Sequence, residues 1–156
     1  MEIPPQLLHI LLADDDNEEQ LIFQETLGEL SSKIKLSFVT NGDDLMSTLN
    51  DTSLKLPDII FLDLSLHSGN NNDCMSEIRM SERLKNIPVV VFTNSLNKKD
   101  SDLYYEKGAN LFMRKQFNFN NQKIILKKIF SLNWENHQPF SDQSKFIINL
   151  SNLDEF

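Results

Sequence analysis

The chain has 156 residues, of which 40% are hydrophobic and 24% charged, a balance that predicts one folded domain and excludes a disordered chain. Its 15 Lys and Arg residues against 23 Asp and Glu leave a net charge of −8, which disfavours direct binding to nucleic acid or to a membrane surface. The single cysteine excludes an intramolecular disulfide. The sequence contains neither an apolar run long enough to span a membrane nor a secretory signal, so we expect a cytoplasmic protein.

Short apolar runs alternate along the chain with segments of helical periodicity. The first run, residues 7–13, ends in the acidic triplet 14–16, and Asn17 is expected to cap a helix with Phe23 and Leu27 on its apolar face. The same strand and helix unit then recurs. Later strands are expected at 34–39, 59–62, 89–92 and 109–113, with helices starting near Asp43, running through Met75 to Arg79, spanning about 98–107, and carrying Ile125, Ile129 and Leu132.

Strict alternation of five strands and five helices predicts an α/β protein with a doubly wound, five-stranded parallel sheet covered by helices on both faces. Ligands of such sheets bind beyond the carboxyl ends of the strands. The candidate functional residues are therefore those at which strands stop: Asp14, Asp15, Asp63, Thr93 and Lys115.

Taken alone, each of these residues is more often a helix cap or a turn residue than a functional group. Helix capping, however, does not require acids, a hydroxyl and a lysine at the same edge of one sheet. Carboxylates about 4 Å apart repel by roughly 4 kcal/mol per pair at an effective dielectric of 20, so the cluster favours a bound cation. Oxygen ligands without His or Cys at metal-binding spacing indicate a hard ion, and Mg2+ fits best.

Four sequence stretches carry a resemblance to a known family. They are Ile10 to Asp16, Pro57 to Leu64, Pro88 to Ser95 and Gly108 to Lys115. In this order and at these separations, they make the chain similar to a bacterial response-regulator receiver domain from its start to about residue 132. The resemblance implies a flavodoxin-like strand order 2-1-3-4-5 and a role as a phosphoprotein in two-component signal transduction.

The resemblance also implies a role for each site residue. Asp63 would accept the phosphoryl group from a histidine kinase or a histidine phosphotransfer protein. Asp15, Asp63 and the backbone carbonyl of Ser65 would hold Mg2+, with Asp14 assisting mainly through water.

Three further roles come from the same resemblance. Thr93 and Lys115 would contact the phosphoryl oxygens, and Phe112 would be an aromatic switch that turns inward when Thr93 moves. The helix at about 98–107, the fifth strand and the last helix would then form the face that a protein partner reads.

The chain departs from the family pattern after the lysine, where Gln116 stands in place of a proline that is commonly preceded by a cis bond. A cis bond before a residue other than proline costs about 2.5 to 4 kcal/mol, so we expect a trans bond and a different loop. This departure bears on the direction in which Lys115 points. Asn94, next to Thr93, is larger than the usual residue and is expected to narrow access to the phosphoryl group.

We divide the chain into a receiver domain, residues 1–133, and a C-terminal tail, residues 134–156. The tail is too short for a separate DNA-binding or catalytic domain, so we expect a stand-alone receiver whose output is an interaction with a downstream protein. Its apolar residues leave two placements open: against its own domain, or against a second chain in a homodimer.

Two other functions are compatible with the sequence. A receiver-like scaffold could bind partners without phosphorylation, and Gln116 is its best support. A Mg2+-dependent phosphatase with an aspartate nucleophile usually needs a second acid two residues later, where this chain has Ser65, so we do not expect an enzyme. A flavodoxin is disfavoured because its first loop must cradle phosphate, which the acidic triplet 14–16 would repel.

Overall fold

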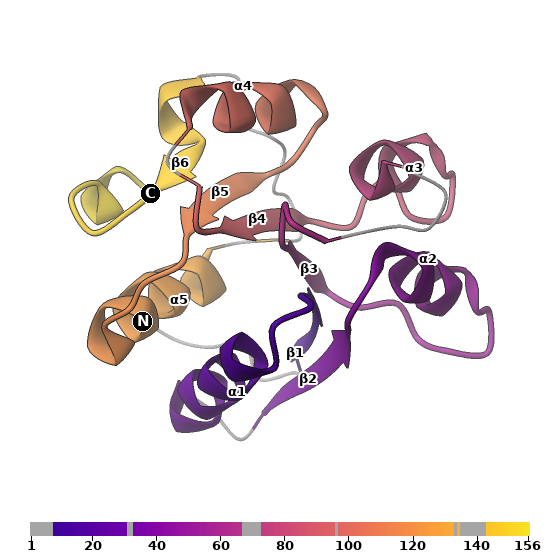
Figure 1. Ribbon diagram of the computed structural model, residues 1–156, viewed down its shortest axis with the longest axis horizontal. Coiled ribbons are helices and arrows are strands. Elements are labelled where there is room, and N and C mark those ends of the chain that lie inside the picture. Colours follow the sequence, from indigo (N-terminus) through magenta and orange to yellow (C-terminus); the bar gives the residue numbers. More distant parts are fainter. Residues whose placement is uncertain (1–7, 31–32, 67–72, 96, 133, 135–142) are drawn as a thin grey trace.

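A computed structural model describes residues 8–30, 33–66, 73–95, 97–132, 134 and 143–156 of the chain. Its core is a parallel sheet in the order β2-β1-β3-β4-β5-β6 (Figure 1). The first five strands confirm the expected order 2-1-3-4-5. They are β1 (Leu8–Ala13), β2 (Ile34–Val39), β3 (Ile59–Leu62), β4 (Val89–Thr93) and β5 (Leu111–Arg114).

Helices cover both faces of this sheet, as the sequence predicts. In Figure 1, α1 and α5 lie on one face, and α2, α3 and α4 lie on the other. Their bounds are α1 (Asn17–Leu30), α2 (Gly42–Asn50), α3 (Cys74–Met80), α4 (Lys98–Glu106) and α5 (Phe119–Ser131). No helix in the described part of the chain is long and apolar enough to cross a lipid bilayer.

Side chains of Asn and Asp begin most of these helices. Asn41, Asp73, Asn97 and Asn118 each accept a hydrogen bond from a backbone N–H in the first turn of α2, α3, α4 and α5. At α1 the prediction of Asn17 as the cap is wrong. Asn17 is already helical, and the carboxylate of the preceding residue, Asp16, accepts from the backbone N–H of Glu18.

The fifth strand begins two residues later than expected, because Gly108 and Ala109 form the C-terminal capping turn of α4. Gly108 adopts a positive φ of 92°, and the backbone N–H of Ala109 still donates to the carbonyl of Tyr104 in α4. Asn110 then donates its backbone N–H to the carbonyl of Val89 and brings the chain into register with β4. Regular pairing of β5 therefore starts at Leu111.

The core consists of two apolar clusters, one on each face of the sheet. The cluster under α1 and α5 contains the rings of Phe23, Phe61 and Phe92, which meet edge to face at centroid distances of 5.0 to 6.1 Å. The cluster on the other face joins α2, α3 and α4 to the sheet and includes Phe112. Strands β3 and β4, which are buried along their whole length, hold the two clusters together.

A sixth strand, β6 (Ile147–Ile148), is a feature that the five-stranded prediction lacks. It pairs in parallel with β5, in the register Phe112 to Ile147 and Met113 to Ile148. Short 3-10 turns, η1 (Gln143–Lys145) and η2 (Leu153–Glu155), flank it. Phe146 and Ile148 are each only 1% exposed, so this part of the tail packs against the sheet of its own chain.

Candidate functional site

Three carboxylates meet at the carboxyl ends of neighbouring strands. Asp14 and Asp15 follow β1, and Asp63 follows β3, which pairs directly with β1. Each of the three can place one oxygen within 4.8 Å of the others, in an arrangement that could hold a metal ion. Asp14 and Asp63 are buried, whereas Asp15 is exposed. The predicted cluster is therefore formed, with one acid open to solvent.

Lys115 enters the same cluster from the end of β5. Its Nζ lies 2.7 Å from Oδ2 of Asp14 and 3.2 Å from Oδ2 of Asp63, and its side chain is only 4% exposed. The Lys115 backbone N–H donates to the carbonyl of Thr93 at 2.7 Å, which fixes the direction in which the side chain leaves the strand. The lysine ammonium also lies 5.3 Å from the centre of the Phe92 ring.

Burial and charge act in opposite directions on these groups. Burial raises the pKa of Asp14, and the hydrogen bond from Lys115 offsets this only in part. Burial alone would lower the pKa of Lys115, but the hydrogen bond to Asp14 and the charge of Asp63 outweigh it and raise that pKa. One ammonium faces three carboxylates, so the cluster can accommodate a further cation.

Asp63 is held in place by its own loop. Its Oδ1 accepts a hydrogen bond from the backbone N–H of Ser65 at 3.1 Å, and its Oδ2 accepts one from the Ser65 hydroxyl at 2.9 Å. A cavity of about 190 Å3 opens beside Asp63, between β3 and the start of α3, with Asp73, Tyr104 and Lys107 on its walls. The carboxylate is therefore fixed in orientation and can be approached from that side.

Thr93 and Phe112 lie on neighbouring strands but differ in their surroundings. Thr93 is buried at the end of β4, where its Oγ1 accepts from the backbone N–H of Ser95 at 3.1 Å. Phe112 points to the α4 face, where its ring centre lies 5.9 Å from that of Phe146. Asn94, the larger residue next to Thr93, is exposed.

The loop after Lys115 follows the expectation for a chain without the usual proline. No peptide bond among the described residues is cis, including the bond before Gln116. The Gln116 side chain donates to the carbonyl of Arg114 at 2.9 Å and closes a compact turn. Lys115 nevertheless reaches both buried carboxylates, so this departure does not turn it away from the site.

Sequence reasoning missed two residues at the edge of the cluster. Gln20, on the first turn of α1, donates its side-chain amide to the backbone carbonyl of Asp14 at 2.8 Å. Glu19 is half-buried near the cluster, and burial raises its pKa. The sequence suggested only a favourable helix dipole for Glu19. The helical repeat places both residues in the first turn after the acidic triplet, and this spacing would have predicted that they lie beside the cluster.

The comparisons with known proteins agree with this geometry. The family model of the response regulator receiver domain matches residues 10–127. Response regulator Rcp1 of Synechocystis is 31% identical over 119 residues, which cover 74% of this chain and 80% of that protein. The probable methanogenesis regulatory protein FilR2 of Methanothrix harundinacea is 28% identical over 135 residues, covering 83% of this chain and 86% of that protein.

Solved structures show the same likeness. The phosphorylated cyanobacterial phytochrome response regulator RcpA matches with a TM-score of 0.72 and 27% identity, over 86% of this chain and 99% of that one. The Mn2+-bound form of Rcp1 matches with a TM-score of 0.69 and 28% identity over the same shares. The chain therefore belongs to the response regulator receiver domain family and is a phosphoacceptor protein of two-component signal transduction.

Proposed function

We propose that Asp63 is the phosphoacceptor. The observation that carries this proposal is the placement of its carboxylate: buried, oriented by Ser65, paired with Lys115 and adjacent to Asp14 and Asp15. An Asp63 oxygen attacks the phosphorus of a phosphohistidine in line, the P–N bond breaks, and the leaving imidazole nitrogen takes up a proton. The product is an acyl phosphate, a mixed anhydride of the side chain.

The acidic cluster fits a divalent cation, and Mg2+ is the ion we propose. Asp14, Asp15 and Asp63 supply hard oxygen ligands, and the backbone carbonyl of Ser65 would complete the set. The Mn2+-bound form of Rcp1 supports a divalent cation in a related receiver. When bound, the ion neutralises charge on the phosphoryl oxygens during transfer.

The remaining residues have supporting roles in this proposal. The Lys115 ammonium moves from its carboxylate partners to a phosphoryl oxygen, and the Thr93 hydroxyl donates to another. Phe112 is the aromatic residue whose side chain we expect to change position when Thr93 moves. Because these groups stand at neighbouring strand ends, they orient the transfer through side-chain movements, without large rearrangement of the strands.

Receiver domains interact with histidine kinases or with phosphotransfer proteins, and these are the donors for this chain. We propose further that its output is a cytoplasmic interaction with a downstream protein. The acidic balance of the chain, 23 acidic against 15 basic residues, supports a protein target over nucleic acid. In this proposal the chain's own Asp63 receives the phosphoryl group, so the chain is the acceptor of the reaction. We therefore expect no enzymatic turnover of small phosphate esters.

The experiment is phosphorylation by acetyl phosphate or phosphoramidate, followed by intact-mass spectrometry. We expect one added phosphoryl group in the presence of Mg2+, none after chelation by EDTA, and none in Asp63→Asn. Asp58→Asn is the matched control, because Asp58 lies near the start of β3 and accepts from the backbone N–H of His9. Equal labelling of Asp63→Asn would overturn the assignment, and a folded wild type without labelling would favour the scaffold function.

A further inference from the structure

The described part of the tail, residues 143–156, is attached to α4 and β5 by several independent contacts. Gln143 donates its side-chain amide to Oδ1 of Asp102 on α4 at 2.6 Å. The Phe146 ring meets the Tyr105 ring of α4 at 5.3 Å and the Phe112 ring of β5 at 5.9 Å. The docked tail, as we call residues 143–156, is thus held by the helix and the strand that lie beside the candidate site.

A continuous path of hydrogen bonds leads from that site to the start of α4. Oγ1 of Thr93 accepts from the backbone N–H of Ser95. The Ser95 hydroxyl donates to Oδ2 of Asp100 at 2.6 Å and accepts from the backbone N–H of Asn97 at 3.0 Å. Asn97 is the N-cap of α4. A change in the position of Thr93 is therefore a change in the bonds that begin α4.

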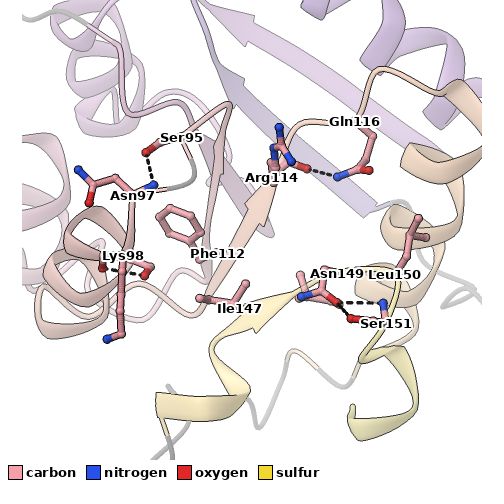
Figure 2. A pocket seen from close by; sticks show the side chains of 12 residues that line it. Ser95, Asn97, Lys98, Phe112, Arg114, Gln116, Ile147, Asn149, Leu150 and Ser151 are labelled. Carbon is pink, nitrogen blue, oxygen red and sulfur yellow. Dashed lines mark hydrogen bonds between the residues drawn. The ribbon is translucent and has the colours of Figure 1, made fainter.

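Phe112 provides a second route to the docked tail. Its ring is only 5% exposed, because it packs in the same apolar cluster as Phe146 and Tyr105. Figure 2 shows the Phe112 ring between the start of α4, which carries Asn97 and Lys98, and Ile147 of β6. Any displacement of this ring alters the packing surface on which Phe146 rests.

The attachment of β6 to β5 is short and lies beside open space. The strand β6 has only two residues, and it borders an open cavity of about 580 Å3 that residues of α4, β5 and the tail line (Figure 2). Because open space lies beside β6 and few strand bonds hold it, we expect changes in α4 or Phe112 to affect how firmly this strand is attached. Cores that are tightly packed on every side do not have this freedom.

The outer edge of β6 is closed by the tail itself. The Asn152 side chain donates to the carbonyl of Ile147 at 2.6 Å and accepts from the backbone N–H of Asn149 at 2.8 Å. The Ile147 carbonyl belongs to the edge strand β6 and the Asn149 N–H follows it directly, and both would otherwise be open to pairing with another chain. The docked tail is therefore a self-contained element that covers the edge of β5.

We propose that docking of the tail onto α4 and β5 and phosphorylation of Asp63 oppose each other. This inference rests on the proposed function. A phosphoryl group on Asp63 draws the Thr93 hydroxyl away from the Ser95 N–H. This movement loosens the hydrogen bonds at the start of α4 and the packing of Phe146 against Tyr105 and Phe112. By linkage, a docked tail stabilises the unphosphorylated state, and release of the tail favours the phosphorylated one. Phosphorylation thus uncovers the surface formed by α4 and β5.

The test uses the full chain with Mg2+ and beryllofluoride, a stable mimic of the acyl phosphate. Hydrogen exchange followed by mass spectrometry should show faster exchange in peptides from 143–149 and at the Phe112 amide, which donates to the Phe146 carbonyl. Calorimetric titration should show that Phe146→Ala binds beryllofluoride about fivefold or more tightly than the wild type does. Gln143→Ala, which removes only the bond to Asp102, should give a smaller shift in the same direction.

The control is Leu49→Ala, which removes a buried side chain from α2, away from the tail. We expect it to lower stability without changing the affinity for beryllofluoride. Unchanged exchange of β6, slower exchange, or equal affinities of Phe146→Ala and wild type would overturn the coupling while beryllofluoride still binds. Failure of the proposed function would instead be seen as no binding of beryllofluoride and no labelling of Asp63.

Discussion

Lys115 shows most clearly how a single residue organises the site. It is buried with two carboxylates, and each of the three groups would be costly to bury alone. The ammonium is the counter-charge of Asp14 and Asp63, and in the proposed function the same charge then serves the phosphoryl oxygens. Replacement of this lysine should therefore affect stability as well as chemistry.

We expect Lys115→Gln to lower the free energy of unfolding by about 3 kcal/mol at neutral pH, because two buried carboxylates lose their counter-charge. Added Mg2+ should restore part of this loss, since it supplies the missing positive charge. Urea unfolding with and without Mg2+ measures both effects. The control is Lys123→Gln, whose partly exposed pair with Glu29 should contribute less than about 1 kcal/mol. Equal stability of the two variants would contradict this account.

His9 offers a test of pH dependence away from the site. Its Nε2 lies 2.9 Å from the Ser37 hydroxyl, and burial, followed by the charge of Lys35, lowers its pKa. The unfolded chain therefore takes up a proton at His9 at a higher pH than the folded chain does. The free energy of unfolding should fall as pH decreases through about 6.5, and it should fall less in His9→Gln. Parallel urea-unfolding curves for both proteins between pH 7.5 and 5.5 would exclude this contribution.

At the level of single residues, the sequence predicts groups that stand directly at strand ends. Asp14, Asp63 and Lys115 were expected to meet and do, because a strand end fixes both the position and the direction of the residue after it. The capping role of Asp16 and the place of Glu19 were not predicted. They depend on where α1 begins, to within one residue, and the sequence does not resolve that boundary.

Among the elements, the connection between α3 and β5 depends on Arg79. Its guanidinium donates to the carbonyls of Gly108, Ile87 and Lys85 and to the side-chain oxygen of Asn110, at 2.8 to 3.1 Å. Asn110 also accepts from the backbone N–H of Val89. This one side chain joins the end of α3 to the starts of β4 and β5. The helical periodicity of α3 predicted its position but none of these bonds.

We expect Arg79→Met to lower the free energy of unfolding by about 3 kcal/mol, because four acceptors lose a charged donor while the side-chain volume is largely kept. Thermal or urea unfolding measures the loss. Arg83→Met, at an exposed position in the following turn, is the control and should change stability by no more than about 0.5 kcal/mol. If both variants unfold at the same urea concentration, the bonds of Arg79 do not support the junction.

For the whole molecule, the docked tail determines which surface the domain presents. Removal of residues 143–156 should lower the free energy of unfolding by about 1 to 3 kcal/mol. Removal abolishes the burial of Phe146 and Ile148, but it also avoids the entropy cost of ordering the tail, so the net loss is small. The uncovered edge of β5 should also associate with other chains in a concentration-dependent way, which light scattering after size exclusion detects.

A chain that ends at Asn152 is the control for this truncation. It keeps β6 and the side chain that closes the outer edge of β6, so it should keep the oligomeric state of the full chain. Identical elution of all three proteins across the concentration range would show that the tail does not protect the edge of β5.

The resemblance to the receiver family predicted the strand order. The amino-acid sequence by itself determined the alternation of strands and helices and the edge at which the acids and the lysine gather. These features follow from local patterns: apolar runs, helical periodicity and the residue at which each strand stops. Tertiary structure decided where residues 143–156 lie and what Arg79 joins. Both depend on surfaces that exist only after the sheet has formed, because the free edge of β5 and the carbonyls around Gly108 come from segments far apart in the chain.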